Sequence, residues 1–198
     1  IISVLLLYFV FGVVVKVDTQ GVPPLLFSMA GLCSWNYFSR VVGEAGSSVI
    51  GAQSLVKKVY FPRLIIPLSK SISALIDLLI VILMLAGMMI AYGLPFGWQA
   101  MMIIPFTLMT ILAGIAFGVW IAVLTIRLRD FTHILPLILR IGMILSPIAY
   151  GASLVPQPYK WAFNLNPLTG IIEGFRWALF NTPLDVNSVW ISLVVILM

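Results

Sequence analysis

Charged side chains are scarce in this sequence. Only 9% of its 198 residues are Asp, Glu, Lys or Arg, whereas soluble domains carry about 25%. Hydrophobic residues make up 62% and the mean hydropathy is +1.17, so polar groups cannot cover the surface of the folded chain. Lipid must therefore surround much of it, which excludes a soluble enzyme or a nucleic-acid-binding domain despite an isoelectric point near 9.6.

Residues that bind metals and phosphates are equally rare. Cys33 and His133 are the single cysteine and histidine, too few for an intrachain disulfide or a metal shell. No GxxxxGK[ST] motif is present, so this chain is not expected to bind ATP by that motif. The six Asp and Glu residues are dispersed, which argues against the remote alternative of a membrane-embedded lipid-linked sugar transferase. We expect no cofactor or metal in this chain.

Long apolar runs are what the sequence does contain. A helix that crosses a bilayer needs about 20 apolar residues. The runs predict one all-α transmembrane domain over 1–198, with six spans at about 1–15, 25–50, 68–92, 99–126, 134–150 and 187–198. Since the first and last runs are cut short, we expect a fragment truncated in spans 1 and 6.

The basic residues indicate which side of the membrane each loop occupies. If spans three and four form a hairpin, the loops at one face and their flanks hold eight of the 11 Lys and Arg against three of the six acids. The other face holds three basic and three acidic residues. The positive-inside rule places the basic face in the cytoplasm.

Residues 153–181 predict a hairpin of short helices on the outer side. Pro136 and Pro147 each remove a backbone donor from the fifth span, and "SPIAYGAS" indicates a break. A helix from 167 to 180 would be only about 20 Å long, too short to cross a ~30 Å core. The hairpin is therefore expected to re-enter the membrane from outside; an amphipathic helix on the outer leaflet is the alternative.

Four local patterns then coincide in order: "LVKKVYFPR", "RLRDF", "SPIAY" and "NPLTGIIEGFRWALF". Together they resemble the ABC-2-type permease subunits of polysaccharide exporters for O-antigen, capsule and teichoic acid, over nearly the whole chain. The resemblance implies a six-span permease in the inner (plasma) membrane. It also implies a homodimer and two separate ATPase subunits that bind ATP and Mg²⁺. The implied substrate is a glycan on a polyprenyl-pyrophosphate lipid, and the 153–181 hairpin resembles the family's outer gate. An ABC-2 permease for a drug or another lipid is the nearest alternative.

The first cytoplasmic loop, 52–67, resembles the family's coupling helix, and its aromatic and basic residues suit an ATPase dock. Positive-inside topology alone would explain its cations but not its Tyr-Phe-Pro. The second loop is a weaker docking candidate whose charges could instead cap helix ends. The residues assigned to coupling are Lys57, Lys58, Tyr60, Phe61, Pro62, Arg63, Arg127, Arg129 and Asp130.

Charged and aromatic residues within the spans predict a substrate path. Arg40 and Arg140 could form a cationic entrance for a lipid pyrophosphate, because a guanidinium matches phosphate oxygens. Pairing of Arg40 with Glu44, together with snorkelling, is the alternative. The assigned path residues are Arg40, Glu44, Arg140, Trp35, Tyr37 and Trp120, and the assigned gate residues are Pro147, Asn166, Pro167, Glu173, Arg176 and Trp177. Glu173 and Arg176 are expected to pair and hold the gate shut.

Overall fold

A computed structural model describes residues 9, 18–51, 65–128, 130–151 and 155–198. Helices, and no strand, occur in these ranges. The main helices are α2 (Pro24–Gly51), α4 (Ile65–Ala91), α5 (Ile103–Arg127), α6 (Phe131–Leu145), α7 (Lys160–Asn164), α8 (Pro167–Phe180) and α9 (Val186–Leu197). Two short 3₁₀ turns, η2 (Trp98–Met102) and η4 (Gln157–Tyr159), precede α5 and α7. The predicted all-helical fold is confirmed.

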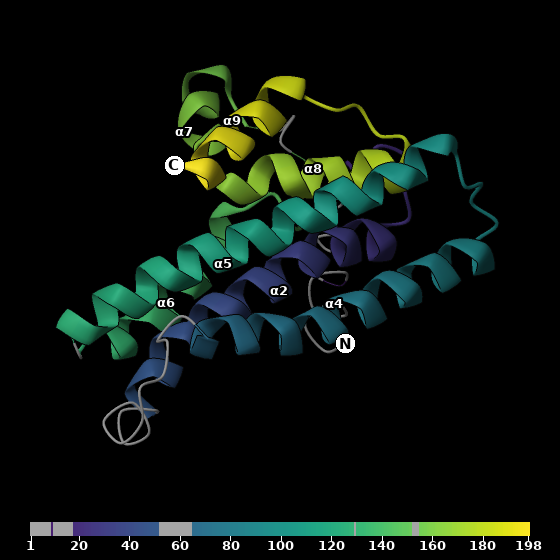
Figure 1. Cartoon of the computed structure of the whole chain (residues 1–198). Helices are drawn as coiled ribbons and strands as arrows, with labels where there is room; N and C mark the ends of the chain where they lie inside the picture. Colours follow the sequence, from purple (N-terminus) through teal and green to yellow (C-terminus); the bar gives the residue numbers. More distant parts are fainter. Residues whose placement is uncertain (1–8, 10–17, 52–64, 129, 152–154) are drawn as a thin grey trace.

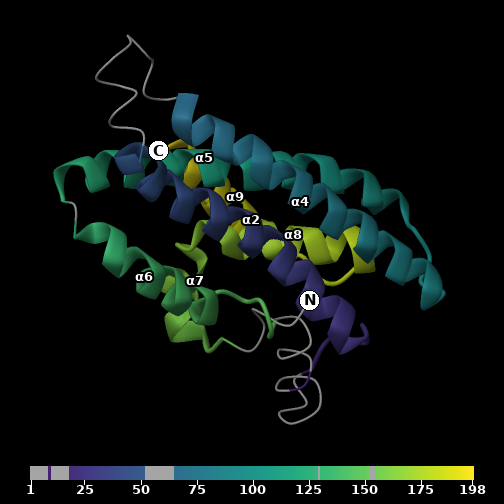
Figure 2. The same cartoon turned by 90° about the horizontal axis from the view of Figure 1, so that it is seen from below.

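Helix α2 occupies the centre of the molecule. It packs against α4, α5, α6 and α8, while α9 lies over α8 and α5 (Figures 1 and 2). The core between α2 and α8 consists of fully buried apolar side chains, including Leu26, Phe27, Ile171, Ile172 and Phe175. A chain surrounded by lipid still buries its largest side chains at helix contacts, because close packing there gains dispersion energy.

Close approach of α5 to α2 depends on two glycines. Gly114 and Gly118 are four residues apart on α5, and both face α2. A Cβ atom at Gly114 would lie 2.9 Å from the ring of Tyr37, and one at Gly118 would lie 3.4 Å from Ala45. This small-residue spacing lets two helix backbones pack closely within a membrane.

Two stretches are long and apolar enough to cross a membrane by length and composition, Leu68–Ala91 and Trp98–Thr125. Only 22% and 28% of the most apolar window of each stretch is buried inside the fold, which leaves side chains of both helices free to face lipid. Helix α6 continues through Pro136 and ends at Leu145, next to the predicted break. The six-span arrangement and the re-entrant position of the hairpin stay predictions.

Candidate functional site

The hairpin that was predicted on the outer side, called the outer hairpin below, is built from α7 and α8, and Asn166 fixes the turn between them. Its side-chain oxygen accepts a hydrogen bond from the Leu168 amide at 3.0 Å and so caps α8, with Pro167 in the first turn. Its amide nitrogen donates to Ser146 Oγ at 2.8 Å. The helix ends at Asn181, which adopts a left-handed conformation with φ 56°. Asn166 thus ties the hairpin to the end of α6.

Arg176 is the charged residue at the centre of this region, and its side chain is only 2% exposed. The guanidinium donates to the Ile148 carbonyl at 2.6 Å and to the Tyr150 carbonyl at 3.2 Å. Both carbonyls belong to the bend that follows α6. Because the bend is not helical, the regular backbone hydrogen bonds of a helix do not satisfy them. A buried carbonyl needs a hydrogen-bond donor, and Arg176 supplies one to each of these two carbonyls of the bend.

The same guanidinium also contacts α2. It donates to the Phe27 carbonyl at 3.3 Å, and its central carbon lies 3.5 Å from the centre of the Phe27 ring. This is the geometry of a desolvated cation–π contact. The bend approaches α2 closely at Gly31, where an added Cβ atom would lie 2.8 Å from the Ile148 carbonyl oxygen. Arg176 therefore joins three segments: α8, the bend and α2.

The expected ion pair between Glu173 and Arg176 does not form among the described residues. Glu173 instead accepts a hydrogen bond from Ser188 Oγ on α9 at 2.9 Å. The two side chains leave α8 toward different neighbours, so each fastens the helix to another element. The prediction of a direct ion pair is therefore wrong, and a gate role for the two residues stays a prediction.

Two glycines let α8 pack closely against α9 and α5. A Cβ atom at Gly170 would lie 2.5 Å from the Ser188 carbonyl oxygen, and one at Gly174 would lie 2.1 Å from the Phe106 ring. The Gly170 amide also donates to Ser192 Oγ at 3.1 Å. Trp177, the remaining residue assigned to the gate on α8, meets Trp98 of η2 edge to face with ring centres 6.3 Å apart.

Charged side chains form a network where α2 packs against α4. Arg40 Nε lies 2.9 Å from Glu44 Oε1, and Arg40 also pairs with Asp77 of α4. Lys70 Nζ lies 3.6 Å from Glu44 Oε2. Arg140 lies exposed on α6 and is not part of this network among the described side chains. The geometry thus favours local pairing of Arg40, and the cationic entrance stays a prediction.

The three aromatic residues assigned to the path are not brought together. Tyr37 points to α4, where its hydroxyl lies 2.5 Å from Ser71 Oγ. Trp120 is 74% exposed on α5, beside the end of α9. Trp35 is buried and lines a cavity between α2, α5, α6 and the outer hairpin. A shared path for the three stays a prediction.

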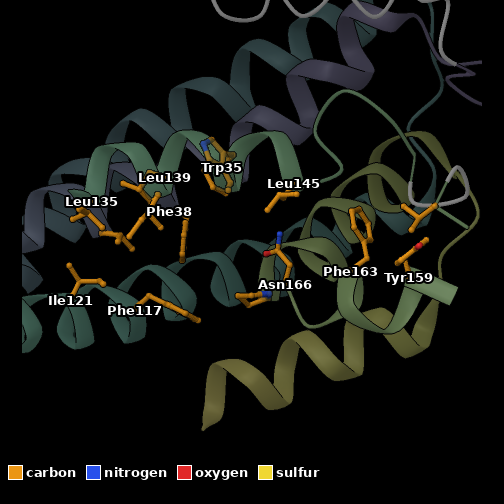
Figure 3. Close-up of a pocket in the computed structure, with 15 residues that line it drawn as sticks. Trp35, Phe38, Phe117, Ile121, Leu135, Leu139, Leu145, Tyr159, Phe163 and Asn166 are labelled. Carbon is orange, nitrogen blue, oxygen red and sulfur yellow. The ribbon is translucent and has the colours of Figure 1, made fainter. Parts of the chain in front are cut away.

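The cavity beside Trp35 has a volume of about 580 Å³. Helix α2 contributes Trp35 and Phe38, α5 contributes Phe117 and Ile121, and α6 contributes aliphatic side chains such as Leu139 (Figure 3). Phe163, Asn166 and Tyr159 close the end next to the hairpin. The lining is almost entirely apolar.

The residues assigned to ATPase coupling mostly lie outside the described part of the chain. This applies to Lys57, Lys58, Tyr60, Phe61, Pro62, Arg63 and Arg129. Arg127 is exposed in the last turn of α5, where a cation complements the helix dipole. Asp130 occupies the N-cap position of α6 without a side-chain capping bond.

Sequence reasoning missed the partners of the hairpin residues. Phe27, Gly31 and the two α9 serines, Ser188 and Ser192, carried no signal as single residues. A weak signal was present in Gly170 and Gly174, whose spacing repeats the small-residue pattern of α5. The preference of Arg176 for backbone carbonyls over Glu173 depends on the tertiary contacts and could not be read from the spacing.

The described residues are mainly helical, and two apolar stretches among them are long enough to cross a membrane by length and composition. Comparison with known families agrees: the profile of the ABC-2 type transporter family matches residues 1–180. The chain belongs to this family and is a membrane component of a transporter rather than an enzyme.

Individual relatives are more specific. Two proteins from Klebsiella pneumoniae named O-antigen export system permease protein RfbA are 26% and 28% identical to the chain over 184 and 185 residues. Each alignment covers 92% of this chain and 70% of the relative. A protein of the same name from Myxococcus xanthus is 23% identical over 168 residues, covering 84% of this chain and 64% of the relative.

Proposed function

We propose that this chain is the permease subunit of an ATP-driven exporter that moves a lipid-linked polysaccharide from the cytoplasm across the inner membrane. The observation that carries the proposal is the similarity to O-antigen export permeases along 84–92% of the chain. The continuity of that similarity supports a shared substrate class, because it includes the outer hairpin as well as the spans.

Two separate ATPase subunits supply the energy in this proposal, and two permease chains form the conduit. The family to which the chain belongs implies an ABC ATPase partner. The 52–67 loop is proposed as the dock on the cytoplasmic side, with Tyr60 and Phe61 as anchors that fill pockets of the ATPase. The substrate is a glycan carried on a polyprenyl-pyrophosphate lipid, and the hairpin of α7 and α8 is the outer gate.

An export assay tests the function in the host cell. Deleting the gene for the full-length permease should remove the polysaccharide from the cell surface and leave the lipid-linked glycan inside. Expression of the permease should restore surface polysaccharide only when the partner ATPase is active. Surface polysaccharide that persists unchanged in the deletion strain would refute the proposed substrate, whereas lost resistance to a drug would favour the drug-exporter alternative.

The docking loop has its own test. Replacing Tyr60 and Phe61 by alanine should reduce co-purification of the ATPase and abolish export, because both anchors are lost. The matched control is Tyr92→Ala, which removes an exposed tyrosine just after α4, on the opposite face in the proposed topology. Unchanged co-purification and export in the loop variant would remove 52–67 from this role.

A further inference from the structure

We propose that the cavity between α2, α5, α6 and the outer hairpin is a binding site for one hydrocarbon chain of a membrane lipid, isoprenoid or acyl. The isoprenoid form rests on the proposed function and locates the lipid anchor of the substrate. The acyl form does not depend on that function. The walls of the cavity carry the inference.

The first argument is the chemistry of the lining. Aromatic and aliphatic side chains from three helices face the same space (Figure 3). Polar side-chain atoms are few among the described lining residues: the amide of Asn166, the indole N–H of Trp35 and the hydroxyl of Tyr159. The Asn166 amide is already engaged, by Ser146 and by the Leu168 backbone. Tyr159 is exposed.

This lining selects against a sugar or a headgroup as the occupant. Each hydroxyl of a glycan needs a hydrogen-bond partner once it leaves water, and the cavity offers very few. A pyrophosphate would need cations, and no Lys or Arg is among the lining residues that the structure describes. A hydrocarbon chain needs neither hydrogen-bond partners nor cations, so it is the class of ligand that fits this lining.

The second argument is shape. The lining residues on α6 run from Leu135 to Leu145, so the cavity follows the helix for about 15 Å at ~1.5 Å per residue. Its volume of about 580 Å³ lies within the ~300–1,000 Å³ range of ligand sites. Helix α6 approaches α2 closely at Gly142, where an added Cβ atom would lie 3.0 Å from the Trp35 ring. The space therefore extends along α6, as one hydrocarbon chain requires.

The driving force is packing rather than transfer out of water. Lipid tails are as apolar as these walls, so the hydrophobic effect does not distinguish cavity from bilayer. A hydrocarbon chain makes more dispersion contacts with densely packed aromatic side chains than with fluid lipid. If the cavity is empty, the side chains that line it lack those contacts. We expect a preference of about tenfold for the cavity position over the lipid-facing surface, equivalent to about 1.4 kcal/mol.

Photo-crosslinking tests the site in the full-length permease. Ile138 lines the cavity at its rim, and Leu137, its neighbour at the same depth, faces away from it; both are about half exposed. Each is replaced in turn by the photoreactive residue benzoylphenylalanine. The protein is placed in nanodiscs of phosphatidylethanolamine containing a small fraction of undecaprenyl phosphate, and mass spectrometry identifies the adducts.

The adducts also distinguish the two sources of the chain. Undecaprenyl phosphate enriched about tenfold at 138 over 137 supports the proposal in its isoprenoid form. Phospholipid adducts with the same excess at 138 support the acyl form. Equal lipid adducts at both positions, or only adducts to protein, overturn the proposal.

A blocking variant shows whether the adduct forms inside the cavity. Ile121→Trp replaces an aliphatic side chain of α5 by a bulky indole ring that fills part of the cavity. It should lower the lipid adduct at 138 about tenfold, back to the level at 137. An adduct that is unchanged by this substitution overturns the proposal, because the chain then lies outside. Surface polysaccharide that persists in the deletion strain, with the crosslink at 138 still formed by the wild-type cavity, would instead count against the proposed function alone.

Discussion

Replacing Arg176 by methionine gives the most direct test of how the outer hairpin is held. The substitution keeps the length and the apolar stem but leaves the carbonyls of Ile148 and Tyr150 without their donor. Leaving each carbonyl unsatisfied costs about 1–3 kcal/mol, and loss of the desolvated contact with Phe27 costs about 2 kcal/mol more. Relief of the buried charge offsets several kcal/mol of this sum. The net loss of stability is about 2–4 kcal/mol.

Thermal unfolding of the detergent-solubilised full-length protein measures this loss. At about 2–4 °C per kcal/mol for a chain of this size, the Tm should fall by about 4–16 °C. Arg140→Met is the matched control, since Arg140 is exposed on α6, and its Tm should change by less than about 2 °C. A drop for Arg176→Met no larger than that of the control would refute the claim that this guanidinium holds the bend.

Three further contacts are tested by substitution, each in the same thermal assay. Gly170→Ala should destabilise by at least about 1–3 kcal/mol because its Cβ atom would meet α9 backbone, whereas Gly87→Ala, with open space around it, should be neutral or stabilise by up to about 1 kcal/mol; equal effects would contradict the seating of α8. Arg40→Asp and Asp77→Arg together should cost about 0.5–1 kcal/mol less stability than the sum of the two single reversals. The value is small because both side chains are partly exposed. Strictly additive effects would exclude the ion pair. Asn166→Ala should cost about 1–2 kcal/mol through the lost cap of α8, and a smaller loss than for an exposed asparagine such as Asn187 would count against it.

The helical elements followed directly from the pattern of apolar residues. The predicted run at 68–92 and helix α4 nearly coincide, as do the predicted short helix at 167–180 and α8. Such helices were predictable because local composition decides them: long apolar runs bounded by Pro, Gly or charge. The turn at Asn166 and Pro167 was predictable for the same reason, since a cap and a first-turn proline act within a few residues.

The partners of charged residues were less predictable. Arg40 and Glu44 pair as their i, i+4 spacing indicates, but the addition of Asp77 comes from the packing of α4 on α2. Glu173 and Arg176 show the opposite outcome, because neighbouring helices offered each a different partner. Spacing on one helix predicts which side chains can meet, and tertiary packing decides whether they do.

The packing of α8 restricts how the proposed outer gate can open. Gly170 packs against α9, Gly174 packs against α5, and the buried Arg176 bonds the bend after α6. Rotation of α8 about its own axis would break these contacts and replace them with steric clashes. Movement of α8 is therefore expected to occur at two hinges, the bend after Leu145 and the left-handed residue Asn181. If the hairpin of α7 and α8 is the gate that we propose, it opens by moving α8 as a rigid body.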